Sequence, residues 1–158
     1  MDRTAILSPC GRFRQRLRIR WADGRVLLVI GLNPSRANEE RTDASTVKVE
    51  GLAKREGFGA FEWANLYPFI ATDPADLRAA GYPLGDDADL HLRQAIAVAD
   101  AVAVAWGANA HGLARPAEVL SLLRQAGARP LCWGTTKQGH PRHPLYLSGA
   151  TALRPFGG

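Results

Sequence analysis

The sequence predicts a single α/β domain, a three-layer α/β/α arrangement with a four-stranded parallel central sheet and an N-terminal antiparallel hairpin. Three observations predict this class. The chain has 158 residues, which fits one domain of ordinary size. Its 46% hydrophobic and 22% charged residues are typical of a globular protein rather than a disordered or fibrous one. Apolar runs alternate with segments of helical periodicity, which favours parallel strands joined by helices.

The N-terminal region, residues 1–25, carries the whole excess of positive charge. It holds seven arginines against Asp2 and Asp23, whereas the rest of the chain holds 13 basic and 13 acidic residues. Arginines alternate with apolar or amide side chains over residues 12–21, which predicts a half-buried strand. Asp23-Gly24 is a hairpin turn signal, so this strand is expected to pair antiparallel with residues 26–30.

The core, residues 26–148, is expected to hold four strands and four helices, followed by a tail at residues 149–158. Continuous apolar runs predict buried central strands, while Asp43 is the expected cap and Gly57 the expected stop of the first helix. In the third helix the expected buried side includes Leu90 and Ile96. The expected strands are 26–30, 61–66, 101–106 and 130–133, and the expected helices are 44–56, a short one from Pro74, 86–99 and 116–126.

The arginine row of the first strand has two interpretations. Arg12, Arg14, Arg16, Arg18 and Arg20 fall on one face, about 7 Å apart, and like charges at that spacing repel one another. The row is therefore a charged edge that prevents aggregation, or a surface laid against phosphates. In the second interpretation Arg14, Arg16 and Arg18 bind nucleic acid.

Composition excludes several classes of protein. Two cysteines are too few for a disulfide framework or a four-cysteine metal site, and they indicate a reducing, cytoplasmic location. Asp100 interrupts the longest apolar run and the first residues do not look like a secretion signal, so no membrane association is expected. His111, His140 and His143 follow no metal-ligand spacing. We therefore expect neither a metal nor a cofactor.

Polar and aromatic residues collect where the expected strands end. In parallel sheets with helices on both faces, ligands bind beyond the carboxyl ends of the strands. Glycine and proline at those ends fix sharp turns and let a ligand approach the backbone closely. The segments are Gly31-Leu32-Asn33-Pro34-Ser35, Asn65-Leu66-Tyr67-Pro68, Trp106-Gly107-Ala108-Asn109-Ala110 and residues 139–146.

This ordered set resembles the uracil-DNA glycosylase superfamily. Gly31-Leu32-Asn33-Pro34 is similar to its water-activating Gly-x-Asn-Pro motif, and Asn65 stands where a base-reading asparagine follows the second strand. Trp106-Gly107 with Ala110 is similar to its Trp-Gly-x-x-Ala segment, and His143-Pro144 falls where a late His-Pro-Ser motif stands. Nearly the whole chain also resembles bacterial domain-of-unknown-function family 1643. The first resemblance implies a glycosylase-like fold and metal-independent hydrolysis of an N-glycosidic bond.

The resemblance gives three side chains a chemical role. An asparagine amide is no general base, so Asn33 would orient a water through its carbonyl oxygen, or would cap its own loop. Asn65 offers donors and an acceptor that match O4 and N3–H of uracil, or it closes the strand structurally. His143 would donate to O2 of the leaving pyrimidine, a stabilisation of about 3 kcal/mol by analogy with oxyanion donors.

Further residues complete the expected site. Tyr67 and Phe69 stack on a base or pack in the core, and Gly31, Pro34 and Ser35 shape the base-binding loop. Asp43 is an accessory group or only a helix cap, and Trp106 is a second accessory residue. The remaining expected phosphate contacts, which otherwise are solvated surface residues, are Arg36, Lys137 and Arg142.

Three functions are compatible with these residues. The first is a glycosylase-like hydrolase that removes a damaged or deaminated pyrimidine base in base excision repair. Leu145-Tyr146 replace the Ser-Pro of the family motif and no intercalating loop is evident, so single-stranded DNA is a more favourable substrate than duplex DNA. The second is a non-catalytic nucleic-acid or nucleotide-binding module, and the third is a hydrolase of a small nucleotide-like metabolite.

Overall fold

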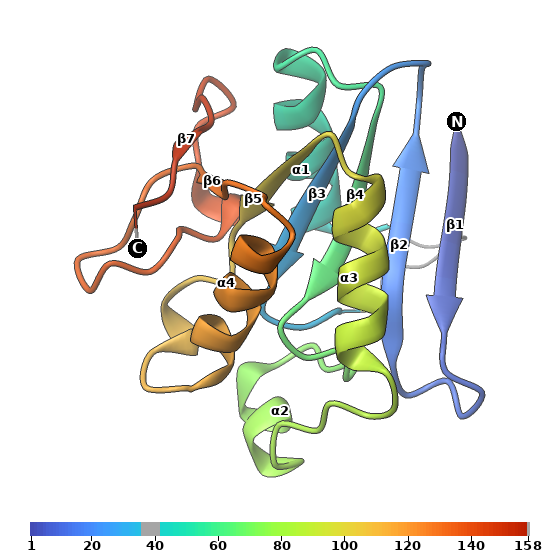
Figure 1. The fold of residues 1–158 in the computed structure, drawn as a ribbon, viewed down its shortest axis with the longest axis vertical. Coiled ribbons are helices and arrows are strands. Elements are labelled where there is room, and N and C mark those ends of the chain that lie inside the picture. The colour runs from blue at the N-terminus through green and yellow to red at the C-terminus, as the bar shows by residue number, and fades with distance from the viewer. Residues whose placement is uncertain (36–41, 158) are drawn as a thin grey trace.

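A computed structural model of the chain describes residues 1–35 and 42–157. The described residues form one α/β domain built on a mixed, seven-stranded sheet with the order β1-β2-β4-β3-β5-β6-β7 (Figure 1). The strands are β1 (Asp2–Leu7), β2 (Arg14–Arg20), β3 (Val26–Gly31), β4 (Ala60–Asn65), β5 (Ala101–Val104), β6 (Leu131–Cys132) and β7 (Arg154–Pro155). The helices are α1 (Ala44–Arg55), α2 (Pro74–Ala79), α3 (Ala88–Val98) and α4 (Arg115–Gln125), with short 3-10 turns η1 (Ala108–Ala110) and η2 (Pro144–Tyr146).

The sheet is larger than the sequence predicted. The pairs β4–β3, β3–β5 and β5–β6 are parallel, whereas β1–β2, β2–β4 and β6–β7 are antiparallel. Both edge strands, β1 and β7, were absent from the sequence prediction, which treated residues 149–158 as a tail. The parallel strands therefore form the centre of a mixed sheet.

The expected pairing of β2 with β3 is wrong, because β4 lies between them. The chain leaving β2 crosses the start of β4, where the backbone amides of Trp21 and Ala22 both donate to the carbonyl oxygen of Gly59. A Cβ atom on Gly59 would lie 2.5 Å from the carbonyl oxygen of Asp23. The Asp23-Gly24 turn is therefore part of a connection over β4, and the glycine at position 59 makes room for it.

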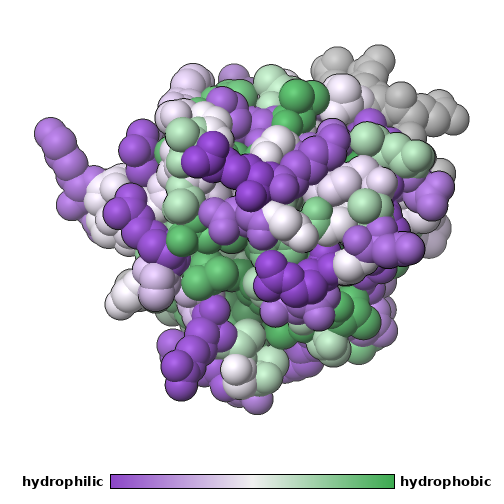
Figure 2. All heavy atoms as spheres, turned by 90° about the horizontal axis from the view of Figure 1, so that it is seen from above, coloured by the Kyte–Doolittle hydropathy of each residue, from purple (hydrophilic) through white to green (hydrophobic). Residues whose placement is uncertain are grey.

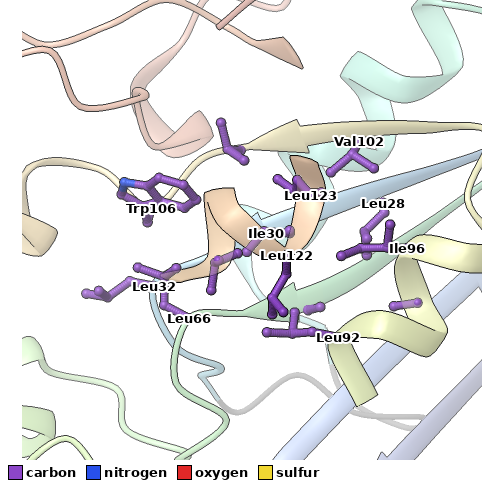
Figure 3. Packing of buried hydrophobic residues seen from close by; sticks show 14 of the residues in the cluster. Leu28, Ile30, Leu32, Leu66, Leu92, Ile96, Val102, Trp106, Leu122 and Leu123 are labelled. Carbon is purple, nitrogen blue, oxygen red and sulfur yellow. The ribbon is translucent and has the colours of Figure 1, made fainter. Parts of the chain in front are cut away.

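Helices cover both faces of the sheet. On one face α3 and α4 pack on the sheet, as Figures 1 and 3 show, and on the other face α1 packs on it. The first core cluster joins β3 to α3 and α4 through Leu28, Ile30, Leu92, Ile96, Leu122 and Leu123. The second joins β2, β3 and β4 to α1 through Ile19, Val29, Val49, Leu52, Phe61 and Trp63.

Helix boundaries follow the predicted signals, but one side chain that was predicted to be buried is exposed. Asp43 caps α1 by accepting a hydrogen bond from the amide of Thr46, and Gly57 ends the turn after α1 with a φ of 84°. Leu90, expected in the core, is 49% exposed. The buried stripe of α3 runs through Ala88, Leu92, Ala95 and Ile96, and position 90 falls outside that helical spacing.

The surface is predominantly polar. Figure 2, which views the molecule from above, shows hydrophilic side chains interspersed with small apolar areas and an apolar hollow. Within residues 1–35 and 42–157, no helix is both long and apolar enough to cross a membrane.

Candidate functional site

A cavity of about 540 Å³ lies at the carboxyl ends of the parallel strands. A second hollow, of about 880 Å³, lies at the amino ends of β5 and β6. It is bounded by the ends of α3 and α4 and lined by many small apolar residues. We assign the candidate site to the first cavity, because polar side chains from four separate loops converge there. Its lining includes Arg14, Gly31, Asn33, Pro34, Ser35, Asp43, Trp63, Asn65, Trp106, Asn109, Thr136, Arg142, His143, Leu145 and Tyr146.

Asn65 is the most informative residue of this cavity. It ends β4, only 6% of it is exposed, and its Nδ2 is buried without a hydrogen-bond partner. A buried amide donor left without a partner costs about 1 to 3 kcal/mol. The opposite residue on β3 is Gly31, and a Cβ atom there would lie 2.8 Å from Oδ1 of Asn65. The glycine therefore leaves room for the carboxamide, whose donor remains available to a ligand.

Asn33 is held by the loop that follows β4. Its Nδ2 donates to the carbonyl oxygens of Ala71 at 2.7 Å, Pro34 at 3.0 Å and Phe69 at 3.4 Å. Because all three neighbours are hydrogen-bond acceptors, the side-chain atom facing them is the nitrogen and not the oxygen, which fixes the orientation of the carboxamide. From the sequence, Asn33 was expected either to cap its loop or to orient a water. The two roles are compatible, because the capping hydrogen bonds use only Nδ2 and leave Oδ1 as an acceptor.

His143 approaches the cavity beside the loop that follows β5. The amide of Leu145 donates to its Nδ1 at 3.2 Å, so the neutral ring carries its proton on Nε2. Burial lowers the pKa of His143, and the negative charge of Asp43 offsets only part of this effect. Gly107 permits the close approach, since a Cβ atom on it would lie 3.3 Å from Cβ of His143 and its φ is 76°. A neutral imidazole with an Nε2–H donor results at pH 7.

Asp43 combines a structural and an electrostatic position. Its Oδ1 accepts from the amide of Thr46 at 2.8 Å, and its Oδ2 accepts from the hydroxyl of Ser35. Burial raises the pKa of Asp43, but these hydrogen bonds and the charge of Arg14 outweigh it and hold the pKa below its ordinary value. The cavity therefore contains a carboxylate that stays ionised at neutral pH.

Arg14 lines the cavity because β2 contains a bulge. The pairing of β1 with β2 shifts between Ile6, opposite Arg16, and Leu7, opposite Arg14, so Gln15 is an extra residue. A bulge reverses the alternation of side chains, which separates Arg14 from the rest of the arginine row. Burial lowers the pKa of Arg14 to about 10, which still leaves the guanidinium charged at neutral pH.

Arg16 and Arg18 lie outside the cavity and pair with an acid. Arg16 donates to both carboxylate oxygens of Glu62, at 2.5 and 3.1 Å, and Arg18 donates to Oε2 at 3.3 Å. Glu62 is only 2% exposed. The arginine row is also not an edge, because β1 covers β2. Glu62 therefore neutralises one of the two guanidinium charges of Arg16 and Arg18.

The other expected site residues lie in varied places. Trp106 lines the cavity with 2% exposure, and Arg142 lines it with an exposed side chain. Lys137 is exposed but does not line the cavity. Tyr67 packs on Tyr82 and Phe69 packs on Phe13, so both take the core-packing alternative. Arg36 lies outside the described residues.

The lining includes residues that were not predicted as site residues from the sequence, among them Trp63, Tyr146, Asn109 and Thr136. Trp63 forms a wall that is fixed to α1 by a hydrogen bond from its Nε1 to Oγ1 of Thr46 at 3.0 Å. Tyr146, Asn109 and Thr136 also line the cavity. A signal existed for Tyr146, because it departs from the family motif, and for Asn109, because it lies in a strand-end segment. Nothing in the local sequence indicates Thr136.

The described residues contain no cluster of three or more histidine, cysteine or acidic residues suited to a metal ion. His111 and His140 do meet, with 2.9 Å between Nδ1 of the first and Nε2 of the second, but they form a hydrogen-bonded pair. The polar side chains that line the cavity are three carboxamides, an imidazole, a carboxylate, hydroxyls and two arginines.

Fold and site together define a single-domain α/β protein with a cavity lined by polar side chains at the carboxyl ends of its parallel strands. Over residues 14–145 the chain matches the family described as "Protein of unknown function (DUF1643)", and it belongs to that family. No curated protein matches it. No solved structure matches it either.

Proposed function

We propose that the protein binds a pyrimidine base in this cavity and hydrolyses its N-glycosidic bond, with a fold related to uracil-DNA glycosylases. The observation that carries the proposal is the buried, unpartnered Nδ2 of Asn65. Buried polar groups in folded proteins are generally hydrogen-bonded, so this donor calls for a partner, and a ligand in the cavity can supply the acceptor. The exocyclic carbonyl O4 of uracil is an acceptor of the required kind, and its neighbour N3–H can donate to Oδ1.

Each step of the reaction has a residue of suitable chemistry. Asn33 orients the attacking water through Oδ1, and the ionised Asp43 stabilises the positive charge that develops on the sugar. As the water oxygen bonds to the anomeric carbon, the electron pair of the breaking C–N bond moves onto the base. His143 donates from Nε2–H to O2 of the departing anion, and the water proton passes to solvent. No residue here is a strong general base, so a slow enzyme is expected.

The geometry gives less support to binding through the arginine row. Arg16 and Arg18 share Glu62, and Arg14 faces the cavity instead. The single carboxylate of Glu62 neutralises one of these two guanidinium charges, so the row displaces fewer counterions from nucleic acid than five unpaired arginines would. Among the described residues both cysteines are free, which fits a reducing cytoplasm.

The test is release of uracil from a single-stranded oligonucleotide with one deoxyuridine, and from deoxyuridine itself. Asn65→Leu has a similar side-chain volume and removes the unpartnered donor, so we expect lost release with unchanged or higher thermal stability. Gln94→Ala, an exposed amide on α3 outside the cavity, is the control. If the wild-type protein releases no uracil while a known glycosylase does, the proposed activity is refuted.

A further inference from the structure

The rim of the cavity carries an unusually exposed aromatic ring. Tyr146 is 84% exposed, more than any other large hydrophobic side chain among the described residues, the next being Met1 at 71%. Single exposed apolar residues are ordinary on protein surfaces. Tyr146 differs in its position, because it also lines the cavity that contains Asn33, Asn65 and His143.

The backbone holds this ring outward. Tyr146 ends η2, between Pro144 and Leu147, which are both buried. The amide of Leu147 donates to the carbonyl oxygen of Pro144 at 3.1 Å, and Nζ of Lys48 donates to the carbonyl oxygen of Leu147 at 2.7 Å. Anchors on both sides keep the residue between them from turning inward. The exposed position is therefore built into the segment.

A cation accompanies the ring at the same rim. Arg142 lines the cavity, its side chain is exposed, and it forms no ion pair with a residue of the described ranges. Guanidinium groups bind phosphate through paired, charge-assisted hydrogen bonds. An aromatic ring and a guanidinium without an ion pair among the described residues, both lining this cavity, match a nucleotide that presents a base and a phosphate.

The cavity extends beyond the space of one base. Its lining reaches from Arg14 on β2 to Arg142 after β6. These strands are four positions apart in the sheet order, which corresponds to about 19 Å at about 4.8 Å per strand. Stacked bases are separated by about 3.4 Å, so the rim at Tyr146 can hold a neighbour of the nucleotide bound at Asn65.

We infer that Tyr146 stacks on a nucleotide adjacent to the one in the cavity, so that the ligand is a single-stranded oligonucleotide rather than a free nucleotide. The inference rests on the proposed function, since it takes the cavity to be a base site. Single strands are favoured because their bases are free to stack on protein aromatics. A base in a duplex is already stacked, and exposing it costs a few kcal/mol.

The test compares two probes by isothermal titration calorimetry. One is deoxyuridine 5′-monophosphate, and the other is a single-stranded pentanucleotide with deoxyuridine at its centre. We expect the pentanucleotide to bind more tightly than the monophosphate, and more tightly than the same five nucleotides held in the duplex stem of a DNA hairpin. Tyr146→Ala should weaken pentanucleotide binding about 10- to 100-fold and leave monophosphate binding unchanged, whereas Tyr146→Phe should keep both. Leu90→Ala, a change at another exposed apolar side chain, is the control.

Three results would overturn the inference. The first is equal affinity of the wild-type protein for the monophosphate and the pentanucleotide, or for the pentanucleotide in single-stranded and in duplex form. The second is a Tyr146→Ala variant that binds the pentanucleotide normally, or that loses both probes equally. These two leave the base site intact if the monophosphate still binds. The third is a wild-type protein that binds neither probe, which refutes the proposed function as well.

Discussion

Glu62 is the buried acid that pairs with Arg16 and Arg18 of β2, and Glu62→Gln removes its charge with little change in shape. The carboxylate is 3% exposed as a side chain, Arg16 is 14% exposed and Arg18 is 32% exposed. Removing one partner of a fully buried ion pair costs about 3 to 5 kcal/mol. Because Arg18 keeps part of its hydration, we expect a lower free-energy cost of about 2 to 3 kcal/mol. In a domain of this size that cost lowers Tm by about 5 to 10 °C.

The assay is urea denaturation followed by tryptophan fluorescence, with thermal unfolding as a second probe. Glu50→Gln is a matched control, because Glu50 pairs with Lys54 at 2.9 Å in an exposed helix position, where such pairs contribute about 0.5 kcal/mol or less. A loss below about 0.5 kcal/mol for Glu62→Gln would contradict the buried ion-pair network. The same variant also tests function. If the arginine row binds nucleic acid, releasing it from Glu62 should tighten binding, whereas we expect no change.

Three further predictions follow from the cavity. Asp43→Ala should lower the free energy of unfolding by about 1 kcal/mol, measured by denaturation, because it removes the cap of α1. Asp43→Asn should keep the cap and the stability but reduce turnover, measured as uracil release. Gly31→Ala should weaken deoxyuridine monophosphate binding about 10-fold or more in calorimetry by displacing Asn65, whereas Gly51→Ala, in open space on α1, should be harmless or stabilising. In an NMR titration the His143 ring should protonate at a pH below 6.5, the ordinary pKa of a histidine. As the pH drops below 6.5 the unfolded chain takes up this proton before the folded protein does, so the free energy of unfolding should fall. A titration midpoint of His143 at or above pH 6.5 would contradict the burial effect.

The central strands and the convergence of the loops could be predicted because their signals are local or general. The apolar runs that became β3 and β4 are buried at every position. Asn33, Asn65 and His143 were expected to meet because carboxyl ends of parallel strands share one edge of a sheet, and all three line one cavity. Their chemical roles remain predictions.

Other features depend on long-range pairing that no local pattern reveals. The position of β4 between β2 and β3 depends on a crossing at Gly59, far from the turn at Asp23. The bulge in β2 requires β1 as its partner, so strict alternation in the sequence placed Arg14 with Arg16. Edge strands β1 and β7 are largely exposed and carry little hydrophobic pattern of their own.

Site residues were missed in the sequence prediction for the same reason, namely that their positions depend on contacts between distant parts of the chain. Trp63 reads as an ordinary core residue in a strand, but in the fold it lines the cavity and donates a hydrogen bond to Thr46 of α1. Tyr146 reads as part of a turn, and the hydrogen bond that holds the next residue, from Lys48 to the carbonyl oxygen of Leu147, joins positions 99 residues apart. Exposure of a rim residue is a property of the assembled fold.

The most direct measurement is the NMR signal of the Asn65 side-chain amide during titration with deoxyuridine 5′-monophosphate. If the unpartnered Nδ2 donates a hydrogen bond to the carbonyl of a bound base, its proton resonance should move downfield as the site saturates. The resonance of the Gln94 side-chain amide should not shift. A saturable binding event that leaves the Asn65 amide unchanged, or the absence of any binding, would contradict a nucleobase site at this position.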